Sequence, residues 1–237
     1  MRTLVRHVAV AACGVLAVVG CGGDAEPEGE PLPADAAVIV AAASRAMGDV
    51  TSVRFQLKRS GAPVFIDQFE SLALDEIVGR FSAPSSADAV LTVTVDADLV
   101  TQLAAVAIDE TVWLSNPVTG TFEPLPPGYD IDPSTFFDPE GGWRPLLAEL
   151  SDVTLVGVED RGGKRYHIRG VAPAARIEVV TAGVVQDQDV LIDFWMRRDT
   201  ALVTTAEFST TFNGQVSDWV LELRDFGKDF TIKAPEN

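Results

Sequence analysis

The fold is decided by the stretch Ser52-Val53-Arg54-Phe55-Gln56-Leu57-Lys58. Its apolar side chains alternate with polar ones, and a period of two is typical of a β-strand with one buried and one solvated face. The segment Ser60-Gly61-Ala62-Pro63 follows and supplies residues that turn the chain. The stretch therefore predicts a strand that ends in a turn, as in a sheet of antiparallel neighbours.

Runs of the same kind recur along the rest of the chain. We expect further strands at about 66–70, 74–81, 88–96, 99–108, 111–115, 152–160, 163–170, 189–197, 200–210, 216–224 and 228–233. Turn-type residues separate them, for example Asp109-Glu110, Asp160-Arg161-Gly162-Gly163 and Asn213-Gly214. No helical pattern interrupts the chain between residues 51 and 115, which favours an antiparallel meander over βαβ units in this region.

Three helices are expected among these strands. Asp35 is a good N-cap for the first, in which Ile39, Ala43 and Met47 recur at helical spacing up to about residue 48. The second is expected at about 143–150 and the third at about 173–183, where β-branched residues weaken the helical pattern. A short helical turn is expected at 134–138.

The strands are numerous enough to curve the sheet. Strand twist accumulates in a sheet of about ten or eleven strands, so the sheet curls and its concave apolar face needs a cover. The helices are the available cover. The fold class predicted is α+β: a single curled antiparallel sheet with a few helices on its concave face, which can leave an apolar hollow between them.

The N-terminal region has the layout of a secretory signal. Arg2 and Arg6 precede an apolar run from residue 8 to residue 19, which is too short to span a bilayer as a helix. The run ends at Val18-Val19-Gly20-Cys21, a pattern that resembles the lipobox of bacterial lipoproteins. That resemblance implies a signal peptide at 1–20 and lipid attachment to Cys21. The alternative is an ordinary cleavable signal with an incidental cysteine.

Residues 21–33 are rich in Gly, Pro and acids, and we expect them to form a disordered tether that carries the lipid on Cys21. The remaining residues, 34–237, are long enough for one sizeable domain. This organisation places the domain outside the cytoplasm, anchored to the outer face of the plasma membrane.

The net charge excludes some functions. The chain has 35 acidic against 18 basic residues and a net charge of −17, so its surface repels phosphate backbones and no nucleic-acid partner is expected. Anionic headgroups would be repelled as well, which leaves acyl chains on Cys21 as the means of membrane attachment. Cys13 lies in the predicted signal, so no disulfide is expected in the domain.

The sequence offers no machinery for catalysis or metal binding. His167 is the one histidine downstream of the signal, and its place on an alternating strand predicts that it faces solvent. No Gly-x-Ser-x-Gly motif is present. Asp130, Asp132, Ser134 and Asp138 fit a calcium loop in part, but Thr135 replaces the required glycine and Gly141 the required glutamate. We expect no enzyme, no metal and no cofactor, and core packing for the four tryptophans.

Taken together, the sequence resembles the actinobacterial LppX/LprA/LprF/LprG lipoproteins. The resemblance covers the domain and rests on the order and spacing of the lipobox and several segments: Val53-Arg54-Phe55, Gly128-Tyr129-Asp130, Phe137-Asp138-Pro139, Gly142-Trp143-Arg144-Pro145-Leu146-Leu147, Tyr166-His167-Ile168-Arg169-Gly170, Phe194-Trp195-Met196 and Asp225-Phe226-Gly227. Two departures are Trp113, where the family usually has tyrosine, and Glu178 with Thr181 in the third helix.

The resemblance implies a half-barrel with an apolar cavity that takes acyl chains of phospholipids, triacylated glycolipids or triacylglycerol. It also implies transfer of these lipids from the plasma membrane toward the outer cell envelope, with a membrane transporter as a partner of a monomeric protein. Strand alternation gives the candidate cavity residues, although alternation does not distinguish cavity from solid core. They are Val53, Phe55, Leu57, Leu91, Val93, Val95, Ile168, Ile192, Phe194, Phe208, Leu221 and Leu223.

Two other classes of function are left open by the sequence. One is an acidic interaction module that docks a transporter or envelope partner without carrying lipid. The other is an enzyme that acts on envelope lipids or glycans.

Overall fold

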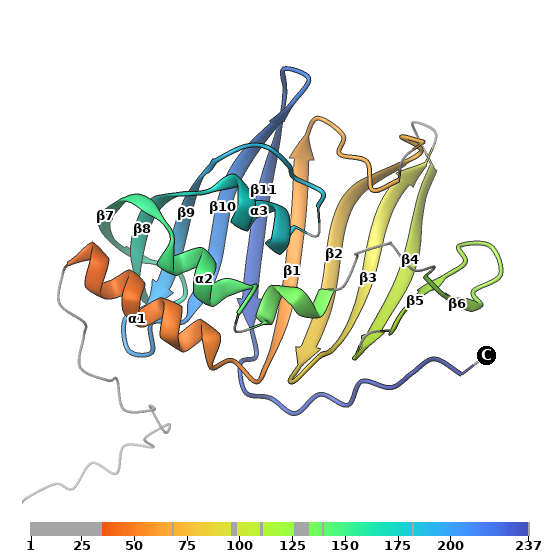
Figure 1. The fold of residues 1–237 in the computed structure, drawn as a ribbon, viewed down its shortest axis with the longest axis horizontal. Helices are drawn as coiled ribbons and strands as arrows, with labels where there is room; N and C mark the ends of the chain where they lie inside the picture. The colour runs from red at the N-terminus through yellow and green to blue at the C-terminus, as the bar shows by residue number, and fades with distance from the viewer. Residues whose placement is uncertain are drawn as a thin grey trace, which may run out of the picture.

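The computed structural model describes residues 35–67, 69–95, 99–109, 111–125, 133–138, 140–181 and 183–236. They form one antiparallel sheet of eleven strands in the order β6-β5-β4-β3-β2-β1-β11-β10-β9-β8-β7 (Figure 1). The strands are β1 (Ser52–Gly61), β2 (Leu72–Ser82), β3 (Ser86–Val95), β4 (Leu99–Ile108), β5 (Thr111–Ser115), β6 (Phe122–Pro124), β7 (Ser151–Asp160), β8 (Lys164–Ala172), β9 (Val190–Arg197), β10 (Val203–Phe212) and β11 (Gln215–Arg224). Because β6 and β7 are its two free edges, the sheet is open, and the predicted single curled sheet is confirmed.

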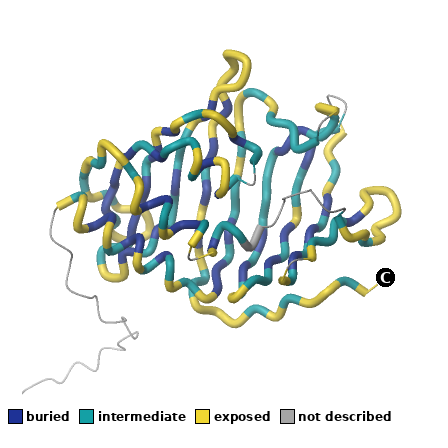
Figure 2. The backbone as a smooth tube through the Cα atoms, in the orientation of Figure 1, coloured by how far each residue is buried: buried dark blue, intermediate teal, exposed yellow. Residues whose placement is uncertain are grey.

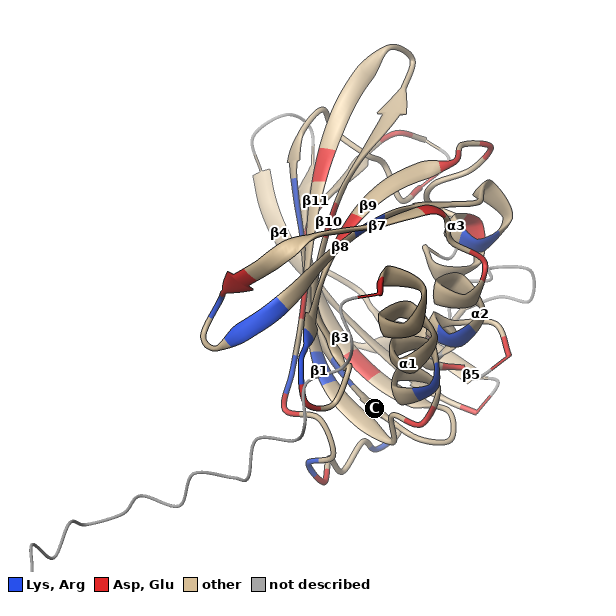
Figure 3. Cartoon of the chain, turned by 90° about the vertical axis from the view of Figure 1, so that its left-hand side faces the viewer, with Lys and Arg blue, Asp and Glu red and all other residues tan. Residues whose placement is uncertain are grey.

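The helices lie on the concave side of this sheet, as the side view shows (Figure 3). They are α1 (Ala36–Gly48), the 3-10 helix η1 (Pro133–Phe137), α2 (Trp143–Ala148) and α3 (Ala174–Val180). The fold is therefore a half-barrel with a helical cover, and α2 and α3 are a few residues shorter than the sequence pattern predicts.

The deciding stretch forms the central strand of the sheet. β1 pairs with β2 on one side, where Phe55 lies opposite Gly79, and with β11 on the other, where Phe55 lies opposite Leu223. Val53 and Phe55 are buried while Arg54 and Gln56 are half-buried, as alternation requires. The predicted strand is confirmed.

Helix α1 begins at the predicted cap. The Asp35 carboxylate accepts the backbone N–H of Ala37 at 2.9 Å, which satisfies one of the free donors of the first turn. Ile39, Ala43 and Met47 are buried, so the predicted apolar stripe packs inward.

The strand predicted at 66–70 is wrong, because this segment is part of the loop between β1 and β2. The Asp67 carboxylate accepts the backbone N–H groups of Phe69 at 3.2 Å, Ser71 at 3.0 Å and Leu72 at 2.7 Å. Donors held by this side chain are not available to a neighbouring strand, so the loop is closed by local hydrogen bonds instead.

The strand predicted at 228–233 is also wrong. After β11 the chain turns at Asp225 and Gly227, both with positive φ, and leaves the sheet. Both edges of β1 are already paired, so the departing tail finds no free edge there. Instead the guanidinium groups of Arg54 and Arg80 lie 5.9 and 5.7 Å from the ring of Phe230. Without these two segments ten predicted strands remain, and the short strand β6, which the sequence pattern did not predict, makes the eleventh.

The main buried cluster joins the helices to the strands β1–β3 and β8–β11, where buried residues face the helices (Figure 2). Phe81 of β2 stacks on Phe137 of η1 at a ring distance of 4.8 Å, and Trp143 of α2 meets Phe194 of β9 edge-on at 6.5 Å. These contacts fix the helical cover against the sheet.

His167 does not face solvent as predicted, because a cluster of partners on the outer face covers it. The residue is 8% exposed, its Nδ1 lies 2.6 Å from Glu159 Oε1, and its Nε2 lies 2.6 Å from Asp193 Oδ1. Its ring stacks on the Trp195 indole with the ring centroids 4.4 Å apart. The Arg161 guanidinium carbon lies 3.6 Å from the centroid of the Trp195 ring. The strand alternation holds, but the side chain is buried by its neighbours on β7 and β9.

Candidate functional site

A cavity of about 560 Å³ lies between the concave face of the sheet and the helices η1, α2 and α3. Its size falls within the range of roughly 300–1,000 Å³ typical of small-molecule sites. It is lined by Leu57, Ile66, Asp67, Phe69, Leu72, Leu74, Ile77, Ala89, Leu91, Leu103, Ala105, Val112, Leu114, Leu125, Phe136, Trp143, Leu146, Ile177, Val180, Thr181, Val184, Val185, Ile192, Phe194, Ala206, Phe208, Trp219 and Leu221. All but Asp67 and Thr181 are apolar.

Small side chains on the inward face of the strands leave the space open. Ala89 of β3, Ala105 of β4 and Ala206 of β10 stand at inward positions where a larger residue would fill the cavity. On the same sheet, the rings of Phe208 of β10 and Trp219 of β11 stack at a centroid distance of 6.0 Å. The Trp219 indole N–H donates to Thr210 Oγ1 at 2.9 Å, so this wall presents no free polar group of the indole to the cavity.

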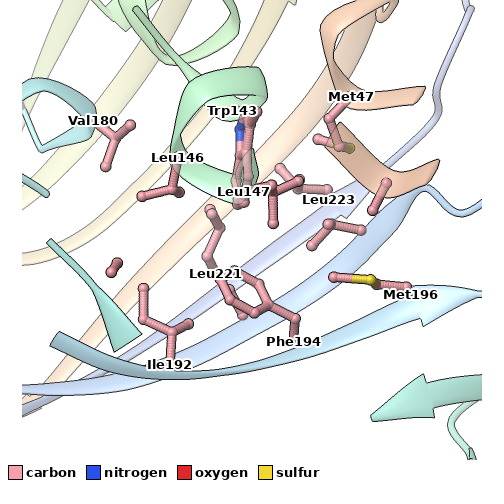
Figure 4. Close-up of a cluster of buried hydrophobic side chains, with 14 of the residues drawn as sticks. Met47, Trp143, Leu146, Leu147, Val180, Ile192, Phe194, Met196, Leu221 and Leu223 are labelled. Atoms are coloured by element: carbon pink, nitrogen blue, oxygen red, sulfur yellow. The ribbon is translucent and has the colours of Figure 1, made fainter. Parts of the chain in front are cut away.

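The roof of the cavity is held by polar contacts away from its interior. Arg176 of α3 donates two hydrogen bonds to the Glu149 carboxylate after α2, at 2.9 and 2.5 Å. The Arg176 guanidinium holds the pKa of Glu149 below its usual range. Ser44 of α1 donates to the Arg144 carbonyl of α2 at 2.8 Å. Figure 4 shows Trp143, Leu146 and Val180 extending from the roof toward Ile192, Phe194 and Leu221 of the sheet.

The two polar lining residues are bound to their own turns. Burial raises the pKa of the Asp67 carboxyl, but hydrogen bonds from Ser71, Leu72 and Phe69 outweigh burial and hold the pKa below its usual range. Thr181 donates its hydroxyl to the Ile177 carbonyl at 2.7 Å and accepts the Val185 N–H at 3.1 Å. The interior of the cavity can therefore bury an apolar ligand away from water, but it has few free polar groups for a ligand to contact.

The structure places the sequence-derived candidates in three groups. Leu57, Leu91, Ile192, Phe194, Phe208 and Leu221 line the cavity. Phe55 and Leu223 border a hollow of about 40 Å³ next to it, shared with Leu57 and Leu221. Val53, Val93 and Ile168 are fully buried in the solid core, and Val95 is half-buried at the end of β3, so these four line neither space.

The sequence-derived set did not include several lining residues of the strands, among them Leu74, Leu103 and Trp219. It also missed the lining residues from outside the strands. These belong to the β1–β2 loop, to the helical roof and to the segment after α3, represented by Phe69, Trp143 and Val184. Trp143 and Trp219 line the cavity, whereas Trp195 packs against His167 on the outer face. The helical spacing of Trp143, Leu146 and Leu147 indicates a buried helix face, but not that Trp143 and Leu146 meet an empty space.

Within the part of the chain that the structure describes, no group of three or more His, Cys, Asp or Glu residues is placed to hold a metal ion. Asp130 and Asp132 of the calcium-loop test lie outside the described residues. Asp138 instead accepts the backbone N–H of Glu140 at 2.8 Å. No helix in the described segments is long and apolar enough to cross a bilayer.

The fold and the cavity define a class: an open antiparallel half-barrel that encloses an apolar cavity under a helical roof. The model of the LppX_LprAFG lipoprotein family matches residues 35–232, so the chain belongs to that family.

Two solved structures show the same fold. The crystal structure of LprF from Mycobacterium bovis superposes with a TM-score of 0.65 at 17% identity, covering 88% of this chain and 100% of that one. The lipoprotein LppX from Mycobacterium tuberculosis gives a TM-score of 0.57 at 14% identity, covering 83% and 97%. A comparison with curated protein sequences found no match.

Proposed function

We propose that the protein binds acylated lipids in the cavity and transfers them from the plasma membrane toward the outer cell envelope. The observation that carries this proposal is a cavity of about 560 Å³ whose walls are apolar apart from two internally bonded residues. Burial of an acyl chain there contributes about 0.8 kcal/mol per CH₂ group. Membership of a lipoprotein family supports the same conclusion.

The chemistry of the walls separates tail from headgroup. A charged or polar headgroup inside would lose its hydration without gaining partners, because Asp67 and Thr181 already serve their own turns. The tails therefore occupy the cavity, and the headgroup stays outside it beside the β1–β2 loop, where Phe69 both lines the cavity and is 80% exposed. Phospholipid, triacylated glycolipid and triacylglycerol all satisfy this requirement.

The same proposal includes the anchor. Residues 1–20 act as a signal peptide, Cys21 carries the acyl chains, residues 22–33 link it to the domain at 34–237, and a membrane transporter supplies or receives lipid. The support is the lipobox-like pattern Val18-Val19-Gly20-Cys21 together with the family match. The protein acts as a monomer on the outer face of the plasma membrane and without catalysis.

The cavity is tested by a pair of variants on neighbouring residues of β3. Leu91→Trp places an indole in the cavity, whereas Val90→Trp places it on the opposite face of the same strand, where Val90 is 41% exposed. We expect Leu91→Trp to lower uptake of a fluorescent diacyl lipid at least fivefold and Val90→Trp to leave it unchanged. Circular dichroism checks that both variants are folded. Equal uptake by the Leu91→Trp variant and the unmodified protein would contradict the proposal that lipid binds in this cavity.

The anchor is tested by exchanging each cysteine for serine in cells fed labelled palmitate. Cys21→Ser removes the thiol that the lipid requires, so we expect the label to disappear from the protein. Cys13→Ser is the control, since this residue lies within the predicted signal, and the label should persist. Labelling of the Cys21→Ser protein would show that the attachment site lies elsewhere.

A further inference from the structure

The two ends of the strands differ in polarity. At one end β1 finishes at Gly61 opposite Ser217, Leu72 pairs with Val95, and Val95 pairs with Leu99. The β10–β11 hairpin closes at the same end through the pair Phe212 and Gln215. We call this end the mouth edge: residues 61–67, 69–72, 95, 99–100, 185–191 and 211–217. The β1–β2 loop and the β10–β11 hairpin stand along the upper margin in Figure 1.

Large apolar side chains are exposed along the mouth edge. They are Phe69 at 80%, Leu99 at 66%, Phe212 at 65%, and also Val100, Leu191 and Val216. No Lys or Arg occurs in its sequence, and the tip of the hairpin is free of them in Figure 3. The opposite end carries charged pairs, among them Arg80 with Asp88 and Lys228 with Asp225. Next to the mouth edge, the guanidinium of Arg59 is held by Asp75 and by the Ala62 carbonyl. Exposed apolar surface gathered at one end marks a site of contact with another apolar body.

The exposed residues continue the wall of the cavity. Phe69 both lines the cavity and is exposed. The period of two puts Phe212 on the same face of β10 as Phe208, and Leu99 on the same face of β4 as Leu103. Phe208 and Leu103 line the cavity. An apolar path therefore leads from the interior to the outside of the mouth edge.

We propose that the mouth edge is a membrane-docking surface whose exposed side chains enter the lipid bilayer, so that acyl chains pass into the cavity without crossing water. This inference rests on the proposed function for the identity of the cargo. Continuity with the cavity selects the bilayer as the occupant, because the bilayer is the source of the acyl chains.

The length of the chain before Asp35 is compatible with this orientation. Fourteen peptide links separate Cys21 from Asp35 and reach at most roughly 50 Å when extended. A ten-residue strand is about 34 Å long. A protein anchored at Cys21 can therefore turn either end of its strands toward the membrane.

The charge of the mouth edge determines which lipid headgroups favour docking. Its charged residues are acids, such as Asp67, Glu70, Asp187 and Asp189. Anionic headgroups repel these carboxylates, so docking depends on apolar insertion and is stronger on zwitterionic than on anionic lipid at low salt.

The test uses a chain that begins at Gly22, so that no acyl anchor contributes. All described helices and strands lie between Ala36 and Arg224, so this chain retains them. It also contains no cysteine, so that one introduced thiol carries an environment-sensitive dye. The dye is placed at Phe212→Cys on the mouth edge or, as a control, at Val158→Cys on β7, where Val158 is 48% exposed at the far end of the strand.

On addition of phosphatidylcholine vesicles, we expect the emission of the Phe212→Cys label to shift to shorter wavelength and that of the Val158→Cys label to stay unchanged. The shift should weaken when a third of the lipid is phosphatidylglycerol, and added salt should reduce that difference. In the unlabelled chain, the double variant Phe69→Ser, Phe212→Ser should lose roughly tenfold or more in vesicle binding. The matched double variant Val156→Ser, Val158→Ser should keep it.

Lipid content is measured in parallel by native mass spectrometry, which separates this proposal from the proposed function. A chain that carries lipid but neither binds vesicles nor shifts the label overturns the docking surface and leaves the cavity standing. A chain that inserts but carries no lipid overturns the proposed function and supports the docking surface. A label that responds only to membranes containing a protein partner assigns the edge to that partner and overturns the proposal.

Discussion

Asp193 shows how one carboxylate on the outer face joins several side chains of the sheet. It accepts two hydrogen bonds from Arg169, at 2.9 and 3.0 Å, and lies 2.6 Å from His167 Nε2. Glu159 Oε1 lies 2.6 Å from the other ring nitrogen of His167, so the imidazole is held between two carboxylates. Burial raises the pKa of Asp193, but the hydrogen bonds from Arg169 and His167 outweigh it and hold the pKa below the usual value of 3.8.

This arrangement predicts acid sensitivity with a definite sign. A carboxyl whose pKa is depressed in the folded state stabilises the fold above its ordinary pKa, and the stabilisation is lost as pH falls through the depressed value. We expect the free energy of unfolding, measured in urea, to fall as pH drops from about 5 to about 2. Asp67, Glu149, Glu159 and Asp225 contribute with the same sign. In Asp193→Asn the fall should be shallower, and an identical slope would contradict the role given to this residue.

The neighbours that bury His167 could not be predicted from the pattern of residues along the chain. The alternation is consistent with His167 on the outer face of β8, but its burial depends on Trp195 of β9 and on Glu159 of β7, which lie on the two neighbouring strands. Neighbours across a sheet are set by strand order and register, and the sequence pattern of a single strand contains neither.

At the scale of the element, local patterns predicted most of the structure. The cap at Asp35 and the alternation of β1 were sufficient because each acts within one element. The segments 66–70 and 228–233 were mispredicted because strand formation also requires a free partner. In the first, Asp67 holds the backbone donors, and in the second no edge of β1 is left unpaired.

Gly79 offers a test of close packing between β1 and β2. A Cβ atom at this position would lie 2.3 Å from Phe55 Cζ and 2.5 Å from the Asp88 carbonyl oxygen. Gly79→Ala therefore displaces the Phe55 ring from its place beside Phe137, and we expect a loss of roughly 1–3 kcal/mol in the free energy of unfolding. Thermal or urea denaturation measures the loss.

The matched control is Gly157→Ala on β7, where a Cβ atom would meet nothing within 4 Å and φ is not positive. This change should be neutral or slightly stabilising, since alanine restricts the unfolded chain. Equal stability of the Gly79→Ala and Gly157→Ala proteins would contradict this packing, because neither the Phe55 ring nor the Asp88 carbonyl would then resist the added Cβ atom.

At the scale of the whole molecule, the cavity is a property of how the roof sits over the sheet. Leu91 and Val93 share a face of β3 two residues apart, yet Leu91 lines the cavity and Val93 is fully buried. The sequence predicts that both point inward. Whether an inward side chain meets a neighbour or an open space depends on the position of η1, α2 and α3, which only the tertiary structure supplies.

The open half-barrel also separates three roles in space. The outer face carries the His167 network, the far ends of the strands carry charged pairs, and the mouth edge combines exposed apolar residues with access to the cavity. An acidic surface with a net charge of −17 keeps the chain from binding anionic surfaces nonspecifically. The apolar interior and the mouth edge are then the regions that the proposed lipid cargo would contact.

The most direct measurement is native mass spectrometry of the chain that begins at Gly22, purified from bacterial cells without its acyl anchor, followed by organic extraction of the bound material. The account predicts an added mass that matches diacyl or triacyl lipid and that is reduced in Leu91→Trp but kept in Val90→Trp. A mass equal to that of the polypeptide alone, both after purification and after incubation with added lipid, would contradict it.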